Sequence, residues 1–168
     1  MTHPLWQHIR TVPDFPKVGI DFYDITPLLD GHIEALITAL TEALPQDVLE
    51  ATETLVAVEA RGFVLASLMA AKLGKKLALV RKAGKLPPPT FCQSYGLEYG
   101  NDTLEIGMHL KPSTVLIIDD VLATGGTLQA THKLCNLAGH DVLGALVLLD
   151  LPALHGDIGL PTWTVLSK

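Results

Sequence analysis

The chain has 168 residues, of which 48% are apolar and 18% charged, and its formal net charge is −6. This length suits a single domain, and the composition supports a sizeable core and excludes a disordered chain. There is no basic run or tail and no apolar stretch of the ~18 residues that a membrane span needs, so we expect neither a nucleic-acid nor a membrane partner. The first residues lack the apolar core of a signal peptide, and Cys92 and Cys135 stand far apart, which predicts free thiols and a cytoplasmic location.

The predicted elements alternate along the chain. Residues 1–29 are rich in proline and are expected to form an irregular arm. Apolar residues at helical spacing predict helices over residues 31–44, 62–73 and 127–138. Short apolar runs predict strands over residues 55–58, 76–80, 104–108, 114–118, 142–149 and 162–166. Together they predict one α/β domain over residues 1–168, with a mainly parallel central sheet flanked by helices.

Residues 81–102 stand apart from this pattern. The segment reads RKAGKLPPPTFCQSYGLEYGND, with three consecutive prolines and no periodicity. A loop of about twenty residues is unusually long for a compact domain, and such loops are commonly functional lids. We therefore expect an irregular lid here.

The block VLIIDDVLATGGTLQA, residues 115–130, joins a buried-looking strand to a helix through two carboxylates and a loop of small residues. Ligands of open α/β sheets bind beyond the carboxyl ends of the strands, and a helix N-terminus offers unpaired N–H groups to a phosphate. Glycine lets the backbone approach a ligand closely, and threonine adds a hydroxyl. The phosphate-binding candidates are Ala123, Thr124, Gly125, Gly126 and Thr127. Asp119 and Asp120 are expected to accept hydrogen bonds from sugar hydroxyls, or to hold Mg²⁺ through water.

Neither GxxxxGK[ST] nor GxGxxG matches this block, which excludes a P-loop NTPase and a dinucleotide fingerprint. The block is similar to the phosphoribosyl-diphosphate signature of the type I phosphoribosyltransferases. The stretches that resemble the adenine branch of this family are PDFPKVGIDFYDITPLL (13–29), VEARGF (58–63), RKAGKLP (81–87) and YGLEYGNDTLEI (95–106). They cover most of the chain in the family's order. The resemblance implies a type I phosphoribosyltransferase fold with an N-terminal base-binding hood over residues 1–29 and a flexible catalytic lid over residues 81–102.

The implied reaction transfers the 5-phosphoribosyl group from 5-phospho-α-D-ribose 1-diphosphate (PRPP) to adenine and gives AMP and diphosphate. Mg²⁺ would ride on the diphosphate, and the enzyme would be a homodimer. The resemblance places the ribose hydroxyls on Asp119 and Asp120 and the 5-phosphate on residues 123–127. The diphosphate would be bound by Arg61, Arg81, Lys82 and Lys85. Lys85 is also a candidate to reach across the dimer interface, as in relatives.

The resemblance implies two catalytic residues: Glu98 as the proton carrier at the base and Arg61 at the leaving group. The base would be read by Asp21, Phe22 and Tyr23, with Phe22 stacking on the ring. Tyr95 and Tyr99 belong to the lid, which would keep water from the cationic sugar that forms when diphosphate leaves.

Asp21 and Tyr23 depart from the family, which usually has an apolar residue and an arginine at these places. They leave open a phosphoribosyltransferase acting on hypoxanthine or guanine. A third reading is a PRPP-sensing regulator without catalysis. Such a regulator would carry a DNA-binding domain, for which this chain has no residues to spare, and would lack residues such as Glu98 that this chain keeps.

Overall fold

The computed structural model describes residues 3–97 and 100–168, and the chain forms two compact units, residues 1–39 and 40–168. The first unit holds the short helix η1 (Pro4–His8), strands β1 (Arg10–Val12) and β2 (Phe22–Asp24), and helix α1 (Thr26–Leu29). Strands β1 and β2 pair antiparallel, with Thr11 opposite Tyr23. Helix α2 (Ile33–Glu42) follows and includes the boundary between the units. The expectation of an irregular arm is therefore wrong for these elements, which are too short to show periodicity in the sequence.

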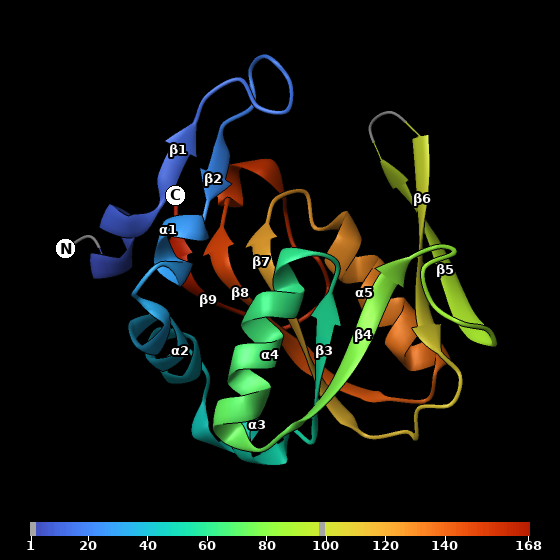
Figure 1. The fold of residues 1–168 in the computed structure, drawn as a ribbon. Helices are drawn as coiled ribbons and strands as arrows, with labels where there is room; N and C mark the ends of the chain where they lie inside the picture. Colours follow the sequence, from blue (N-terminus) through green and yellow to red (C-terminus); the bar gives the residue numbers. More distant parts are fainter. Residues whose placement is uncertain (1–2, 98–99) are drawn as a thin grey trace. The chain divides into compact units, whose positions relative to one another are not determined.

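The second unit is an α/β structure around one sheet (Figure 1). Its helices are α3 (Gln46–Ala51), α4 (Arg61–Leu73), α5 (Gly126–Leu137) and the short η2 (Pro152–Leu154). Its strands are β3 (Thr54–Val58), β4 (Lys76–Lys82), β5 (Thr90–Leu97), β6 (Gly100–Gly107), β7 (Thr114–Leu122), β8 (Asp141–Asp150) and β9 (Thr162–Ser167).

The seven strands lie in the order β5-β6-β4-β3-β7-β8-β9. Strands β4, β3, β7, β8 and β9 pair in parallel, whereas β6 pairs antiparallel with both β4 and β5. The predicted α/β fold with a mainly parallel sheet is confirmed. Since parallel strands all end at one edge, their carboxyl ends bring residues that are distant in sequence together.

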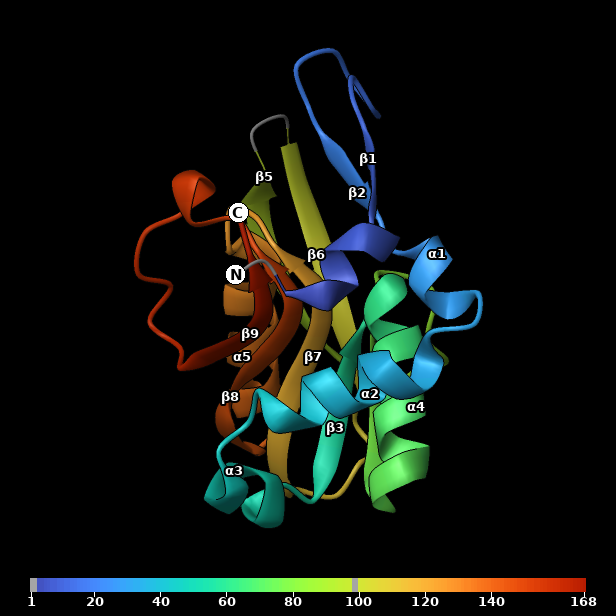
Figure 2. The same cartoon turned by 90° about the vertical axis from the view of Figure 1, so that its left-hand side faces the viewer.

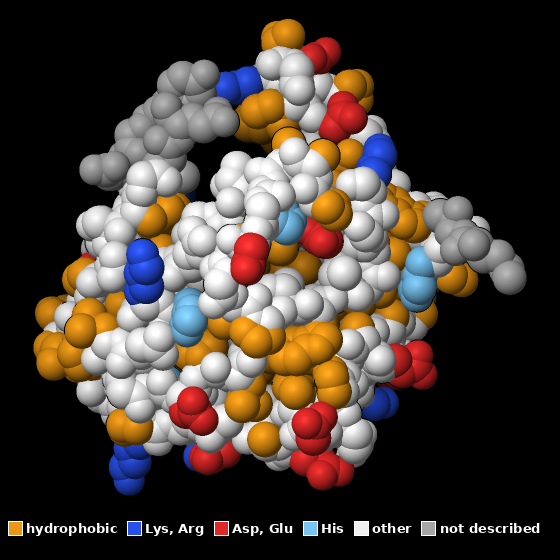
Figure 3. Space-filling view, turned by 180° about the vertical axis from the view of Figure 1, so that it is seen from behind, with side chains coloured by type: hydrophobic (Ala, Val, Ile, Leu, Met, Phe, Trp, Pro, Cys, Tyr) orange, Lys and Arg blue, Asp and Glu red, His pale blue; other side chains and the backbone are white. Residues whose placement is uncertain are grey.

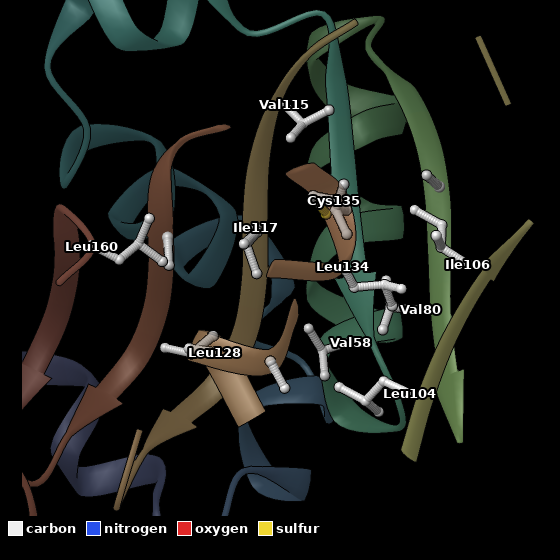
Figure 4. Close-up of a cluster of buried hydrophobic side chains, with 14 of the residues drawn as sticks. Val58, Val80, Leu104, Ile106, Val115, Ile117, Leu128, Leu134, Cys135 and Leu160 are labelled. Atoms are coloured by element: carbon white, nitrogen blue, oxygen red, sulfur yellow. The ribbon is translucent and has the colours of Figure 1, made fainter. Parts of the chain in front are cut away.

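Helices α4 and α5 cover opposite faces of this sheet (Figure 2). Strands buried on both faces read as continuous apolar runs, and all five residues of β3 are buried. Beneath α5 lies a cluster of fully buried side chains that includes Val58, Ile117, Leu128 and Leu134 (Figure 4). Burying such a side chain stabilises the fold by roughly 1.5–3 kcal/mol, so the cluster gives the carboxyl edge a rigid base.

The expectation of an irregular lid over residues 81–102 is wrong for much of that segment, where β5 and β6 form an antiparallel hairpin that pairs Thr90 with Gly107 and Tyr95 with Asp102. Polar residues at half-buried positions such as Gln93 hide the alternation of the strand. Strand β7 also runs past its predicted end at residue 118, because it keeps pairing with β8 as far as Leu122. Helix α3 was not predicted from the sequence; it begins at Gln46, directly after Pro45.

Candidate active site

The carboxyl edge of the sheet gathers most of the predicted site residues of the second unit. Val58 of β3 pairs with Val80 of β4, and Ala57 pairs with Ile118 of β7. The residues that follow in each strand are Glu59, Arg81 and Asp119, so a carboxylate, a guanidinium and a second carboxylate come to neighbouring positions. This edge is the usual ligand-binding place of an open α/β sheet.

Asp119 and Asp120 are buried, with 8% and 5% of their surface exposed. The backbone N–H of Asp120 donates to Asp119 Oδ1 at 2.9 Å, and Asp120 Oδ2 forms an ion pair with Arg61 Nε. Burial, reinforced by the neighbouring Asp120 charge, raises the pKa of Asp119 well above its usual value. Two buried carboxyl groups at a ligand-binding edge need hydrogen-bond donors, which is a chemistry that the vicinal hydroxyls of a sugar can supply.

The small-residue loop lies between β7 and α5 as predicted, and helix α5 begins at Gly126, one residue before its predicted start. Gly125 is the N-cap residue with φ +82°, a left-handed conformation that favours glycine. None of the described side chains caps this helix end, so backbone N–H groups of its first turn are available to an anion. A Cβ at Gly125 would lie 2.5 Å from Ile158 Cγ2, so the loop is also closely packed from behind.

The carboxylate of Glu59, the residue after β3, pairs with the side chains of Arg81 and Lys85. Glu59 Oε1 accepts a hydrogen bond from Lys85 Nζ at 2.8 Å, and Oε2 accepts one from the backbone N–H of Lys82 at 2.9 Å. Arg81 donates from Nη2 to Glu59 Oε1 at 3.4 Å and lies over the ring of Phe63. The Lys85 ammonium, with further hydrogen bonds from Lys82 and Arg81, lowers the pKa of Glu59 to about 2.

The β5–β6 hairpin brings two more groups to the same edge. Lys82 Nζ forms a 2.9 Å ion pair with Asp102, which raises the pKa of Lys82 and lowers that of Asp102. A Cβ on Gly126 would lie 3.6 Å from Tyr95 Cδ2, so Tyr95 lies beside the loop of residues 123–127. Each of the four predicted diphosphate-binding cations is thus ion-paired: Arg61 with Asp120, Arg81 and Lys85 with Glu59, and Lys82 with Asp102.

The base-binding candidates belong to the first unit. Asp21 is exposed, Phe22 is half-buried, and Tyr23 is buried. Phe22 packs edge-on against Phe15 with ring centroids 5.1 Å apart, and Tyr23 packs edge-on against Trp6 at 6.3 Å. Successive side chains of a strand point to opposite faces, so Phe22 and Tyr23 lie on opposite faces of β2 and contact different residues. Glu98 and Tyr99 lie outside the described residues.

Sequence reasoning missed the segment that supports the phosphate loop. Gln129 Nε2 of α5 donates to the backbone carbonyl of Ile158 at 3.2 Å, and Ile158 itself packs against Gly125. It also missed Asp102 as the partner of Lys82. The sequence around Ile158 shows no periodicity that would predict which residue it packs against. Nor does the sequence show which lysine Asp102 binds, because the two residues are 20 positions apart.

A family model described as "Phosphoribosyl transferase domain" matches residues 27–165. An adenine phosphoribosyltransferase of Mycobacterium sp. (strain KMS) is 50% identical over 151 residues, which cover 88% of this chain and 85% of the relative. The crystal structure of adenine phosphoribosyltransferase from Rhodothermus marinus superposes with a TM-score of 0.88 at 42% identity, covering 98% and 96% of the two chains. The Saccharomyces cerevisiae enzyme, solved with an imino-altritol bisphosphate and adenine, gives 0.89 at 33% identity, covering 96% of each chain.

Proposed function

This chain belongs to the adenine phosphoribosyltransferase family, and we propose from this premise how its residues share the work of the reaction. The enzyme transfers the 5-phosphoribosyl group of PRPP to adenine and releases AMP and diphosphate, a reaction of purine salvage. The observation that carries the division of roles is the carboxyl edge of the sheet. It brings together a buried acid pair in the last residues of β7, a glycine loop at the N-terminus of α5, and a group of cations at the ends of β3 and β4.

The sugar and its phosphate bind to the β7–α5 segment. The 5-phosphate lies in the loop of residues 123–127, where backbone N–H groups and the positive end of α5 face it. Asp119 and Asp120 accept hydrogen bonds from the 2- and 3-hydroxyls of the ribose. This arrangement is supported by the burial of the acid pair, because unsatisfied carboxyl oxygens in a dry site are costly and a sugar diol satisfies them.

Departure of the diphosphate leaves positive charge on the anomeric carbon and puts negative charge on the leaving group. Arg61, together with Arg81, Lys82 and Lys85, stabilises the negative charge on the leaving group. The sugar, held by the acid pair, must be kept from water until adenine attacks, and Tyr95 beside the phosphate loop helps to exclude it. Glu98 exchanges the proton at the base, and Phe22 stacks on the purine ring.

Mg²⁺ fits this donor set as a partner of the diphosphate. Among the described residues no cluster of three or more His, Cys, Asp or Glu side chains could hold a metal ion. Mg²⁺ commonly keeps several waters and binds through substrate phosphates and one or two carboxylates, which here are Asp119 and Asp120. When bound it neutralises charge on the diphosphate and so favours its departure.

We expect AMP to form from adenine and PRPP in a direct chromatographic assay, and this formation to stop when EDTA removes Mg²⁺ and to resume when Mg²⁺ is added back. Hypoxanthine and guanine, offered in competition with adenine, should yield much less product. If the chain formed IMP or GMP in preference to AMP, the proposed base recognition would be rejected. If EDTA left AMP formation unaffected, the proposed role of Mg²⁺ would be rejected.

A homodimer is the proposed assembly, and an apolar surface on β4 supports it. Leu77 and Leu79 each expose 38% of their surface on one face of the strand. With Leu86 and Pro87 they line a groove of about 170 Å³. Hydrophobic side chains also gather at the outer edge of the sheet on the side of β5 (Figure 3). Exposed apolar surface of this kind marks an interaction site, and a second copy of the chain is the proposed occupant.

Substituting Leu79→Arg should convert the dimer into a monomer, because a desolvated, unpaired charge is unfavourable in an apolar interface. Size-exclusion chromatography with light scattering gives the mass directly. Leu137→Arg is the matched control, since Leu137 is equally apolar and 55% exposed but lies on α5. A monomeric wild-type chain, or dissociation in the control alone, would refute the proposed surface.

A cytoplasmic location is proposed because Cys92 and Cys135 are free thiols, which a reducing compartment preserves. No helix in the described part of the chain is long and apolar enough to cross a membrane.

A further inference from the structure

The carboxylate of Glu59 lies at the centre of the cations that the proposed function gives to the diphosphate. Its side chain is only 10% exposed, whereas the side chains of Lys85 and Arg81 are 48% and 32% exposed. The cations therefore reach the surface from a carboxylate that stays beneath them. An anion arriving from solvent meets Lys85 and Arg81 already paired with a carboxylate of this chain, which offsets one of their two positive charges.

Glu59 also binds the backbone of the segment of residues 82–85 at the end of β4. Oε2 accepts from the Lys82 N–H at 2.9 Å, and Arg81 Nη1 donates to the Lys85 carbonyl at 3.2 Å. The opposite end of the loop is fixed by a second carboxylate, Glu105, whose Oε2 accepts from the Gly84 N–H at 3.1 Å. The shape of this segment thus rests on backbone hydrogen bonds to Glu59 and Glu105, whereas the side chains of Arg81 and Lys85 pair with Glu59 and not with Glu105.

We propose that Glu59 is a positioning residue that keeps Lys85 and Arg81 in place in the ligand-free enzyme and competes with diphosphate for them, so that it weakens the binding of this product. The proposal rests on the proposed function, because it requires diphosphate to bind these cations. When diphosphate takes Lys85, the Glu59 carboxylate stays close to it, ionised and partly unpaired. Two like charges at such a distance repel each other, and the effect grows as water is excluded.

Diphosphate must leave in every turnover, and product release commonly limits phosphoryl- and glycosyl-transfer enzymes that close over their ligands. A carboxylate that recaptures the lysine as the diphosphate departs lowers the barrier to release. The pKa of Glu59, lowered to about 2 chiefly by the Lys85 ammonium, keeps this carboxylate charged at neutral pH.

The variant Glu59→Gln separates the competition of Glu59 with diphosphate from its support of the backbone at Lys82. The amide oxygen of glutamine still accepts from the Lys82 N–H, so the loop keeps its backbone anchor, while the negative charge near Lys85 is lost. Calorimetric titration of the full-length variant with magnesium diphosphate should give a dissociation constant about 3- to 5-fold lower than that of the wild type, the upper part of the range expected for loss of a partly exposed ion-pair partner. Diphosphate should become a correspondingly stronger product inhibitor, and kcat should fall more than KM for PRPP rises.

Glu105→Gln is the matched control: it removes one charge and keeps one loop anchor without touching the side chains of Arg81 or Lys85, so its diphosphate affinity should stay within about twofold of the wild type. Glu59→Asp keeps the charge but withdraws it from Lys85, and its affinity should lie between wild type and Glu59→Gln.

A Glu59→Gln enzyme that melts like the wild type yet binds diphosphate equally or more weakly would overturn the proposal and leave Glu59 as a purely structural support. If Glu59→Gln failed to fold, Glu59→Asp would decide the question by the same titration. Failure of the wild type itself to form AMP would instead reject the proposed function, which the assay above tests separately.

Discussion

Substituting Gly62→Ala is expected to lower the melting temperature and to reduce activity at the same time. Gly62 is the second residue of α4, and its helix turn presses directly onto β7. A Cβ there would lie 2.7 Å from the Ile118 carbonyl oxygen and 3.3 Å from both Cα and Oδ1 of Asp119. The nearest atoms belong to the backbone of a central strand, so the helix or the strand must shift.

Overpacking of this kind costs about 1–3 kcal/mol, which for a chain of this size lowers the melting temperature by roughly 2–12 °C. The same shift moves Asp119 from the position at which we propose that it binds the ribose, and a displacement of about 1 Å at a reacting group can cost about 100-fold in kcat/KM. Differential scanning calorimetry and the AMP assay measure the two effects.

The exposed Ser67 of the same helix provides the control, because Ser67→Ala adds no atom to a contact and should leave both quantities nearly unchanged. If Gly62→Ala melted at the wild-type temperature with full activity, the close approach of α4 to β7 would not constrain the acid pair.

Substituting Asp119→Asn should separate stability from activity. The amide oxygen still accepts from the Asp120 N–H, but the buried charge and its repulsion with Asp120 are removed. Loss of a hydrogen bond between a hydroxyl and a charged group is worth about 1.5–3 kcal/mol, so kcat/KM for PRPP should fall roughly 10- to 150-fold. The same variant should melt at a higher temperature than the wild type at neutral pH, because functional sites often hold charge at the expense of stability.

The pH dependence follows from the direction of the pKa shift. Because the pKa of Asp119 is raised in the folded state, folding favours the protonated form. The stability linked to this group is therefore fully present below the ordinary carboxyl pKa and is lost as the pH rises through the raised value. The advantage of Asp119→Asn over the wild type should shrink as the solution is acidified.

Thermal melts of both proteins at several pH values measure this difference, and Asp141→Asn, at an exposed carboxylate, is the control. An Asp119→Asn enzyme that melts below the wild type at every pH would show that the ionised pair stabilises the fold.

The sequence predicts the parallel half of the fold well, because buried strands such as β3 and β7 are continuous apolar runs and α4 ends at a glycine with positive φ. It predicts the β5–β6 hairpin poorly. Strand β6 is predicted in part, over residues 104–108, because Leu104 and Ile106 alternate and are buried. Strand β5 instead makes polar contacts such as that of Ser94 with Thr103, which give no apolar alternation. The same reason explains the missed strands of the first unit, which are three residues long.

The candidate site divides in the same way. The acid pair Asp119 and Asp120 and the loop after it are continuous in sequence, so their spacing alone predicts a site for a sugar phosphate. Glu59 and Lys85 are 26 residues apart, and only the pairing of β3 with β4 shows that they meet. Side-chain ion pairs between separate strands depend on register and rotamers, which composition and spacing do not encode.

The antiparallel hairpin joins the rest of the sheet through a short ladder. Strand β6 pairs with β4 only at Arg81–Glu105 and Lys82–Leu104, while it pairs with β5 over eight residue pairs. The hairpin is also attached to the second unit by apolar packing. Leu104 and Ile106 of β6 are buried in the core cluster beneath α5, and Phe91 of β5 packs against that cluster. Because Arg81 and Lys82 are the β4 partners in this ladder, two of the proposed diphosphate-binding residues are held in the sheet by the same hairpin that carries Tyr95.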